Sequence, residues 1–313
     1  MPPRSSVGSI ARGTPARDAL DGAVTAIAAA GCETPRLDAE LLLADALGIS
    51  RERLFVACMA APAAQGVSSG VSPAPGNSRR DKDELVVAGA AVRRFQDFVR
   101  RRSVLREPVA YILGRRHFRR LELTSDPRAL IPRPETELLV EVALSLPEDW
   151  RVLDVGTGSG AVALALKDER PDLGVTGSDL STDALALARA NGERLGLDVH
   201  WLTADLLEDV PDEFEAILSN PPYVPEGDRA MLEPEIVRHE PSRALFAGED
   251  GLDAIRPLIG QAAARPSVRL LALEVGAGQA AAVGELMRAA GFQSVRAERD
   301  LARIERVVVG ERA

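Results

Sequence analysis

Cysteine, histidine and aromatic residues are scarce in this 313-residue chain. The two cysteines, Cys32 and Cys58, and the three histidines lack metal-ligand spacing, so we expect reduced thiols and no metal site. Aromatic residues make up only 4%, so alanine, valine and leucine must fill the cores. No apolar run of about 18 residues occurs, and residues 1–14 lack the apolar stretch of a secretion signal. We therefore predict a cytoplasmic protein without a membrane span.

Net positive charge is also lacking, because 47 acidic residues outnumber 38 basic ones and the net charge is −9. This balance disfavours a general nucleic-acid binder. Residues 93–133 are an exception, with twelve arginines against four acids, which leaves this segment at +8 and the rest at −17. The segment is either a solvated basic face or a docking surface for an acidic macromolecule. Its arginines are Arg93, Arg94, Arg100, Arg101, Arg102, Arg106, Arg115, Arg116, Arg119, Arg120, Arg128 and Arg133.

The first third of the chain has the apolar spacing of helices. Residues 16–60 contain two helical segments, which we expect to end at Gly31 and Gly48, and a further helix is expected from residue 83 to about 105. Residues 61–82 are rich in alanine, proline, glycine and serine without an apolar period, which is typical of a flexible insertion. We predict a small all-α domain over residues 1–105.

The remainder, residues 106–313, is predicted to be a second domain of the α/β class. Residues 108–131 favour a β-hairpin that joins the domains, and Pro134 suits the first position of a helix. The two last strands lack an intervening helix and should pair antiparallel. The pattern predicts a doubly wound, Rossmann-like sheet with an antiparallel edge. Expected strands are 151–155, 174–178, 198–202, 214–219, 268–275, 293–299 and 304–310, and expected helices are 160–169, 182–195, 252–264 and 278–290.

A glycine-rich turn follows the first of these strands, but it is not one of two common nucleotide-binding turns. Its glycines, Gly156, Gly158 and Gly160, have the spacing G-x-G-x-G, which differs from the dinucleotide fingerprint G-x-G-x-x-G. No Lys-Ser/Thr pair follows, so a P-loop is excluded. Asp179, at the end of the second strand, is placed to accept hydrogen bonds from ribose hydroxyls. A tight turn without ligand is the alternative.

This turn resembles the nucleoside-binding turn of class I S-adenosylmethionine methyltransferases. The resemblance implies cofactor contacts from Gly156, Thr157, Gly158, Ser159 and Gly160, with Asp179 holding the ribose. It also implies that Asp205 meets the exocyclic amine of adenine and that Leu206 packs on the ring, although Leu206 is equally consistent with a core leucine. Asp154 is expected to shape the loop.

Asn220-Pro221-Pro222-Tyr223 follows the fourth strand, at the carboxyl end of the sheet where ligands of such folds bind. Two prolines fix φ twice and remove two N–H donors, which makes a stiff turn with free carbonyls. The Asn220 side-chain oxygen and the Pro221 carbonyl can accept both N–H bonds of a planar NH2 group, and Tyr223 can pack against it. We predict methyl transfer to such a nitrogen, with Asn220 near the cofactor and Pro222 near the substrate. A purely structural turn is the alternative.

An ordered set of motifs resembles the release-factor glutamine N5-methyltransferases (the PrmC/HemK family). The set comprises residues 31–43, 106–114, 130–137, 240–252 and 300–307, with Asn220–Tyr223 between them. The resemblance implies methylation of the glutamine in the Gly-Gly-Gln motif of class-1 peptide chain release factors, docked in part by the helical domain. Arg133 either lines the active-site entrance or pairs with Glu135 or Glu137, and Glu240 closes a loop. Arg265-Pro266-Ser267 and Ala302-Arg303 depart from the family's usual glycines.

Two other functions share some of these features. A DNA or RNA amino-methyltransferase, acting for example on adenine N6, would have the same glycine turn and the same Asn220–Tyr223 motif. A non-catalytic release-factor or ribosome-associated binder could keep the fold, but the intact Asn220 and glycines disfavour it. We expect a monomer that binds class-1 release factors and no stable nucleic-acid partner.

Overall fold

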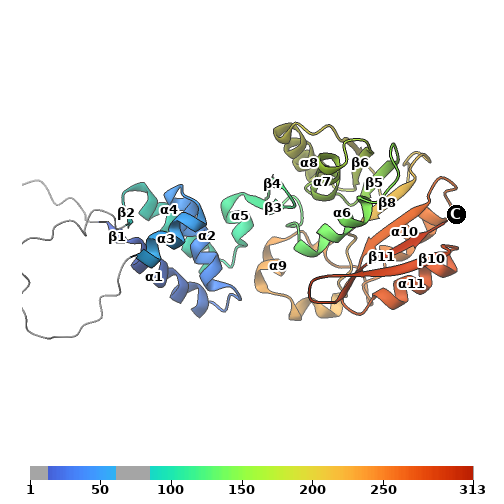
Figure 1. Cartoon of the computed structure of the whole chain (residues 1–313). Coiled ribbons are helices and arrows are strands. Elements are labelled where there is room, and N and C mark those ends of the chain that lie inside the picture. Colours follow the sequence, from blue (N-terminus) through green and yellow to red (C-terminus); the bar gives the residue numbers. More distant parts are fainter. Residues whose placement is uncertain (1–12, 61–84, 313) are drawn as a thin grey trace, which may run out of the picture. The chain divides into compact units, whose positions relative to one another are not determined.

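The computed structural model describes residues 13–60 and 85–312 (Figure 1). The predicted insertion at 61–82 lies outside the described residues. The chain divides into two compact units, Met1–Leu113 and Gly114–Ala313. The division falls after Leu113, later than the expected boundary at residue 105, because Ile112 is buried in the core of the helical unit. The roles given to the two domains stay predictions.

Short helices build the first unit. As predicted, α2 begins at Pro35 and ends at Gly48, which takes the left-handed conformation at φ 64°. Leu20, Leu42 and Phe95 are buried in a shared apolar core. The elements of this unit are β1 (Thr14–Pro15), α1 (Ala16–Ala29), α2 (Pro35–Leu47), α3 (Arg51–Ala60), β2 (Val86–Val87), α4 (Ala90–Ser103) and α5 (Val109–Leu113).

The helix expected over residues 83–105 was predicted too long at its start. Within its described part, Val86 and Val87 form β2, which pairs antiparallel with β1, and α4 begins only at Ala90. Gly89 precedes the helix at φ 59°, a conformation outside the right-handed helical region. Two consecutive β-branched residues favour a strand once a partner strand is present, and that partner lies about 70 residues earlier in the sequence.

Strands and helices alternate in the second unit, and each predicted strand and helix from residue 151 onward is present within a few residues of its expected bounds. The hairpin expected over 108–131 is shorter, because Val109–Leu113 is helical and only Arg115–Phe118 and Leu121–Thr124 pair. The elements are β3 (Arg115–Phe118), β4 (Leu121–Thr124), η1 (Pro134–Thr136), α6 (Glu137–Ala143), β5 (Arg151–Val155), α7 (Ala161–Glu169), β6 (Gly174–Asp179), α8 (Thr182–Leu195), β7 (His200–Thr203), β8 (Ala216–Ser219), η2 (Glu226–Met231), α9 (Pro234–His239), η3 (Ser242–Ala244), α10 (Ile255–Ala263), β9 (Leu270–Glu274), α11 (Ala280–Ala289), β10 (Ser294–Arg299) and β11 (Glu305–Glu311).

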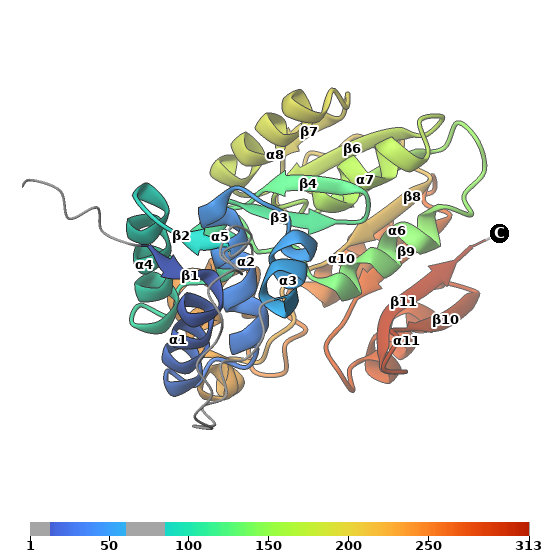
Figure 2. The ribbon, with the colours of Figure 1, turned by 60° about the vertical axis from the view of Figure 1, so that its left-hand side comes forward.

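In the described part of this unit, seven strands form one sheet in the order β10-β11-β9-β8-β5-β6-β7. The strands from β7 to β9 pair parallel, whereas β11 pairs antiparallel with both β9 and β10. Figure 2 shows β10 and β11 at one edge of the sheet. The tight turn between them places Arg303 at φ 63°, so an arginine adopts the backbone conformation that a glycine would favour. The predicted Rossmann-like sheet with an antiparallel edge is confirmed.

Alternating side chains of the strands bury both faces of the sheet. Val152 and Val309 belong to one apolar cluster with α6 and α7, whereas their neighbours Leu153 and Val308 belong to another with α10 and α11. Burial on both faces explains why the strands are near-continuous apolar runs.

Candidate functional site

The glycine turn links β5 to α7 and lines a cavity of about 970 Å³. Gly156, Thr157, Gly158 and Ser159 contribute to the cavity wall, and Gly156 and Gly158 have positive φ values of 70° and 57°. Gly160 does not line the cavity. A Cβ at Gly160 would lie 3.0 Å from atoms of Leu164 and Trp201, so this glycine permits close packing of α7 on the sheet. The expected cofactor contact of Gly160 is therefore not supported by the cavity geometry.

Asp154 shapes the turn, as its position in the sequence suggested. Its Oδ2 accepts hydrogen bonds from the Thr157 hydroxyl at 2.6 Å and from the Ala163 N–H at 3.2 Å. Burial raises the pKa of this carboxyl to about 7. The side chain thus ties the strand end to the turn and to the first turn of α7.

Asp179 ends β6 and faces the same cavity. Its Oδ2 accepts a hydrogen bond from the Gly158 N–H at 2.9 Å, and its Oδ1 accepts one from the Ser181 N–H at 2.8 Å. Burial raises the pKa of the Asp179 carboxyl, and these backbone donors partly oppose that shift. Each oxygen has a further lone pair, so the carboxylate can accept bonds from a diol without releasing the glycine turn.

The third part of the cavity wall follows β7. Asp205 is exposed and lines the cavity, and Leu206 both lines it and packs against the apolar cluster of α10 and α11. The two interpretations of Leu206 are therefore compatible. Leu180, which the sequence did not single out, is a 53%-exposed leucine beside Asp179 in the cavity wall. Two apolar side chains and two carboxylates thus lie on the side of the cavity beside the glycine turn.

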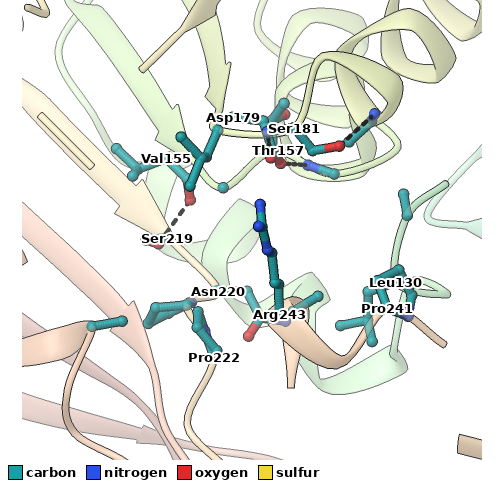
Figure 3. A pocket seen from close by; sticks show the side chains of 18 of the residues that line it. Leu130, Val155, Thr157, Asp179, Ser181, Ser219, Asn220, Pro222, Pro241 and Arg243 are labelled. Atoms are coloured by element: carbon teal, nitrogen blue, oxygen red, sulfur yellow. Dashed lines mark hydrogen bonds between the residues drawn. The ribbon is translucent and has the colours of Figure 1, made fainter. Parts of the chain in front are cut away.

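The Asn220 turn lies next to the glycine turn because β8 and β5 are parallel neighbours, with Ser219 opposite Val155. The Ser219 hydroxyl donates a hydrogen bond of 2.7 Å to the Val155 carbonyl. Asn220, Pro221 and Pro222 line the cavity. The Asn220 Nδ2 donates a hydrogen bond of 3.0 Å to the Thr136 hydroxyl, so this amide is oriented from the far side. Figure 3 shows Asn220 and Pro222 facing the side occupied by Thr157 and Asp179.

Tyr223 is placed differently from the other residues of its motif. It does not belong to the cavity wall, its ring packs against the apolar cluster of α10 and α11, and its hydroxyl donates to Glu274 Oε1 at 3.2 Å. Burial and the neighbouring Glu274 carboxyl raise the pKa of Tyr223. The expected contact between this ring and a substrate is therefore not part of the cavity geometry.

Arg133 lines the cavity, and its partner is neither of the acids that we considered. Its Nη2 donates to Glu240 Oε1 at 2.5 Å, whereas Glu135 and Glu137 lie only two and four residues away in the sequence. The other Glu240 oxygen accepts a hydrogen bond from the Ile131 N–H at 3.2 Å. Glu240 is 5% exposed and ties the loop after the Asn220 turn to the segment before η1.

Two residues that line the cavity, Thr136 and Arg243, were not predicted from the sequence. Thr136 lies inside the 130–137 motif but carries no chemical signal of its own, and Arg243 lies in the short 3-10 helix η3, where the sequence shows no pattern. Figure 3 shows the Arg243 side chain projecting into the cavity toward Thr157 and Asp179. Arg243 is exposed and forms no ion pair with any described residue.

The basic segment is largely neutralised within each unit. At least eight of its twelve arginines form ion pairs with carboxylates, which disfavours a docking surface made of free cations. These are Arg94, Arg100, Arg101, Arg102, Arg115, Arg119, Arg128 and Arg133. Arg102 and Arg106 are buried, so the segment is only in part a solvated face. Among residues 13–60 and 85–312, no group of three or more metal-ligating side chains is present, and no helix is long and apolar enough to cross a membrane.

Comparisons with known proteins agree with this arrangement. Residues 134–248 match the model of the methyltransferase small domain family, and residues 18–64 match that of the PrmC N-terminal domain. The release factor glutamine methyltransferase of Deinococcus radiodurans is 41% identical over 95% of this chain and 98% of its own length. That of Pseudomonas aeruginosa is 42% identical over 88% and 92%.

A solved structure extends the likeness to the fold. The catalytic domain of hMettl16, in complex with the MAT2A 3'UTR hairpin 6, superimposes with a TM-score of 0.51 at 15% identity, covering 71% of this chain and 81% of that one. At this identity the match shows the class I methyltransferase fold alone. The two bacterial relatives match over 95% and 88% of this chain. The chain belongs to the release factor glutamine methyltransferase family.

Proposed function

We propose that this protein transfers a methyl group from S-adenosyl-L-methionine to the side-chain amide nitrogen of the glutamine in the Gly-Gly-Gln motif of class-1 peptide chain release factors. The observation that carries this proposal is the parallel register of β5 and β8. It places the glycine turn and the Asn220 turn side by side, so that a Cβ at Gly156 would lie 4.0 Å from the Asn220 carbonyl oxygen. The substrate is inferred from two relatives, 41% and 42% identical, that are named release factor glutamine methyltransferases.

The donor set on the β6–β7 side of the cavity fits a nucleoside. Asp179 has lone pairs for the ribose hydroxyls, Leu180 and Leu206 offer apolar surface for the ring, and Asp205 can accept from its amine. Arg243 supplies a cation for a carboxylate such as that of the methionine part. When bound, S-adenosylmethionine supplies an electrophilic methyl group on a sulfonium.

The Asn220 turn provides for the other reactant. Because Asn220 Nδ2 is held by Thr136, its Oδ1 is the side-chain atom left to accept a bond from the substrate amide. The Pro221 carbonyl can accept the second N–H, since two prolines keep the turn rigid. Two acceptors pin the poorly nucleophilic nitrogen and stabilise the positive charge that develops on it. As the carbon–sulfur bond breaks and the carbon–nitrogen bond forms, the nitrogen becomes strongly acidic and loses a proton to solvent.

Location and partners follow from the proposed substrate. Release factors act in translation termination, so we infer a cytoplasmic protein whose partner is a class-1 release factor and whose helical unit contributes to docking it. The net charge of −9 and the internal pairing of the basic segment favour a protein substrate over a nucleic acid. A monomeric state stays a prediction.

A labelled methyl donor tests the proposal. The protein is incubated with S-adenosylmethionine carrying a labelled methyl group and, separately, with a purified class-1 release factor, duplex DNA or RNA. We expect label in the release factor alone, and none when Asn220→Ala replaces the wild type. Label in DNA or RNA, with an unlabelled release factor, would establish a nucleic-acid amino-methyltransferase and overturn the proposal.

A further inference from the structure

A hydrogen bond holds each end of the Asn220 turn, and the buried acid Glu274 interacts with both hydroxyls that form these bonds. Asn220 Nδ2 donates to the Thr136 hydroxyl at 3.0 Å, the Tyr223 hydroxyl donates to Glu274 Oε1 at 3.2 Å, and the Thr136 hydroxyl interacts with the same Glu274 carboxyl. We propose that Thr136 and Glu274 are positioning residues that hold the Asn220 amide with its oxygen toward the substrate, and that Tyr223 belongs to this network. The inference deepens, and rests on, the proposed function.

Glu274 is an unusual residue for its place. It ends β9, is 1% exposed and does not line the cavity, and its Oε2 is buried without a hydrogen-bond partner among the described residues. An acid buried without full pairing destabilises a fold, and a site that depends on it is one reason to keep it. Burial raises the pKa of Glu274 to about 7, Glu135 on η1 adds to the shift, and Arg306 on β11 and the Thr136 and Tyr223 hydroxyls oppose it.

Hydrogen-bond direction explains how the acid acts at a distance. The Thr136 hydroxyl has one proton, and an ionised Glu274 draws that proton toward itself. The Thr136 oxygen is then an acceptor, which selects Nδ2 of Asn220 as its partner and leaves Oδ1 for the substrate amide. Without the carboxylate, the hydroxyl can donate to Oδ1, and the amide can turn over. A turned amide presents N–H groups to the N–H groups of the glutamine and loses the acceptor.

The Tyr223 end of the turn is held by its backbone as well. Gln279 Nε2 donates to the Tyr223 carbonyl at 3.0 Å and to the Asp250 carbonyl at 3.1 Å. Gly251 approaches so closely that a Cβ there would lie 2.1 Å from the Tyr223 carbonyl oxygen. These contacts fix where the Tyr223 ring enters the core, so its hydroxyl reaches Glu274 and its ring stays outside the cavity wall.

Matched threonine substitutions in the full-length protein test the relay. Thr136→Val removes the hydroxyl at nearly constant volume, Thr136→Ser keeps it, and Thr176→Val removes a similarly buried hydroxyl of β6 outside the cavity. We expect Thr136→Val to lower kcat for a release factor on the order of 10²-fold, as for loss of one preorganised hydrogen bond. Thr136→Ser and Thr176→Val should keep kcat within a few-fold, and calorimetry should give a nearly unchanged Kd for the cofactor in each variant.

Glu274→Gln and Tyr223→Phe complete the test. The wild-type kcat should rise with pH between about 6 and about 8 as Glu274 ionises, whereas Glu274→Gln should be flat and lower at the upper end. Tyr223→Phe keeps the ring and loses the hydroxyl, so a several-fold loss of kcat supports the network. If the wild type methylates the factor and either Thr136→Val or Tyr223→Phe has an unchanged kcat, the inference is overturned. A wild type that binds the cofactor but leaves the factor unmethylated contradicts the proposed function itself.

Discussion

Asp179 is the residue on which cofactor affinity should depend most. Its two oxygens accept backbone hydrogen bonds, from Gly158 at 2.9 Å and from Ser181 at 2.8 Å, and lone pairs remain on the carboxylate for ribose hydroxyls. Hydrogen bonds to a charged partner contribute about 1.5–3 kcal/mol each. Loss of two such bonds in Asp179→Ala therefore predicts a cofactor Kd higher by roughly 10²- to 10⁴-fold.

Asp179→Asn separates charge from shape. The amide keeps one oxygen acceptor but replaces the other with a donor, so we expect roughly a tenfold weaker Kd. Burial raises the pKa of Asp179, so affinity in the wild type should fall as acidification protonates this carboxyl, and the asparagine variant should lack that dependence.

Isothermal titration calorimetry with S-adenosylmethionine measures both effects, and Asp168→Ala, an exposed acid on α7, is the matched control. If Asp179→Ala binds S-adenosylmethionine with a Kd within about twofold of the wild-type value and melts at the same temperature, the assignment of Asp179 to the ribose is refuted.

Three further predictions concern the catalytic turn and the buried acids. Asn220→Ala should reduce single-turnover methyl transfer on the order of 10³-fold while the cofactor Kd changes only a few-fold, and substantial remaining transfer would contradict the pinning role. Gly251→Ala should lower both kcat and the melting temperature, because its Cβ would lie 2.1 Å from the Tyr223 carbonyl oxygen and its φ is 78°. The matched control is Gly260→Ala in α10, which has open space around it and should stabilise the fold by up to about 1 kcal/mol. Burial raises the pKa of Asp154 and Glu274 to about 7, so between about pH 5 and about pH 7 the folded state binds more protons than the unfolded chain. The free energy of unfolding, measured in urea, should therefore fall between about pH 5 and about pH 8 by up to roughly 3 kcal/mol per group. Glu274→Gln should remove its share, and an unchanged slope would show that Glu274 titrates normally.

Local sequence was sufficient for the parts of the site that depend on neighbouring residues. The strand, glycine turn and helix of residues 151–169 are contiguous, Asp179 ends a strand, and Asn220 follows one directly. The carboxyl ends of parallel strands meet at one edge of a sheet, so strand order alone brings these residues into one cavity.

Contacts between distant segments were not predictable in the same way. Arg133 pairs with Glu240, 107 residues away, although two glutamates stand closer in the sequence. The partner of Tyr223 is Glu274, 51 residues away, and the ring lies outside the cavity wall. The strand at Val86–Val87 likewise depends on Thr14–Pro15. Pairing between distant segments, of side chains in two cases and of strands in the third, is not encoded in composition or periodicity.

Peptide mass spectrometry of a release factor tests the central claim most directly. A purified class-1 release factor is incubated with the protein and S-adenosylmethionine, digested and fragmented, beside a factor whose Gly-Gly-Gln glutamine is replaced by alanine. The account predicts that the Gly-Gly-Gln peptide gains the mass of one methyl group, placed by fragment ions on the glutamine side chain, and that the alanine factor gains none. A methyl group on any other residue, or an equally methylated alanine factor, would contradict it.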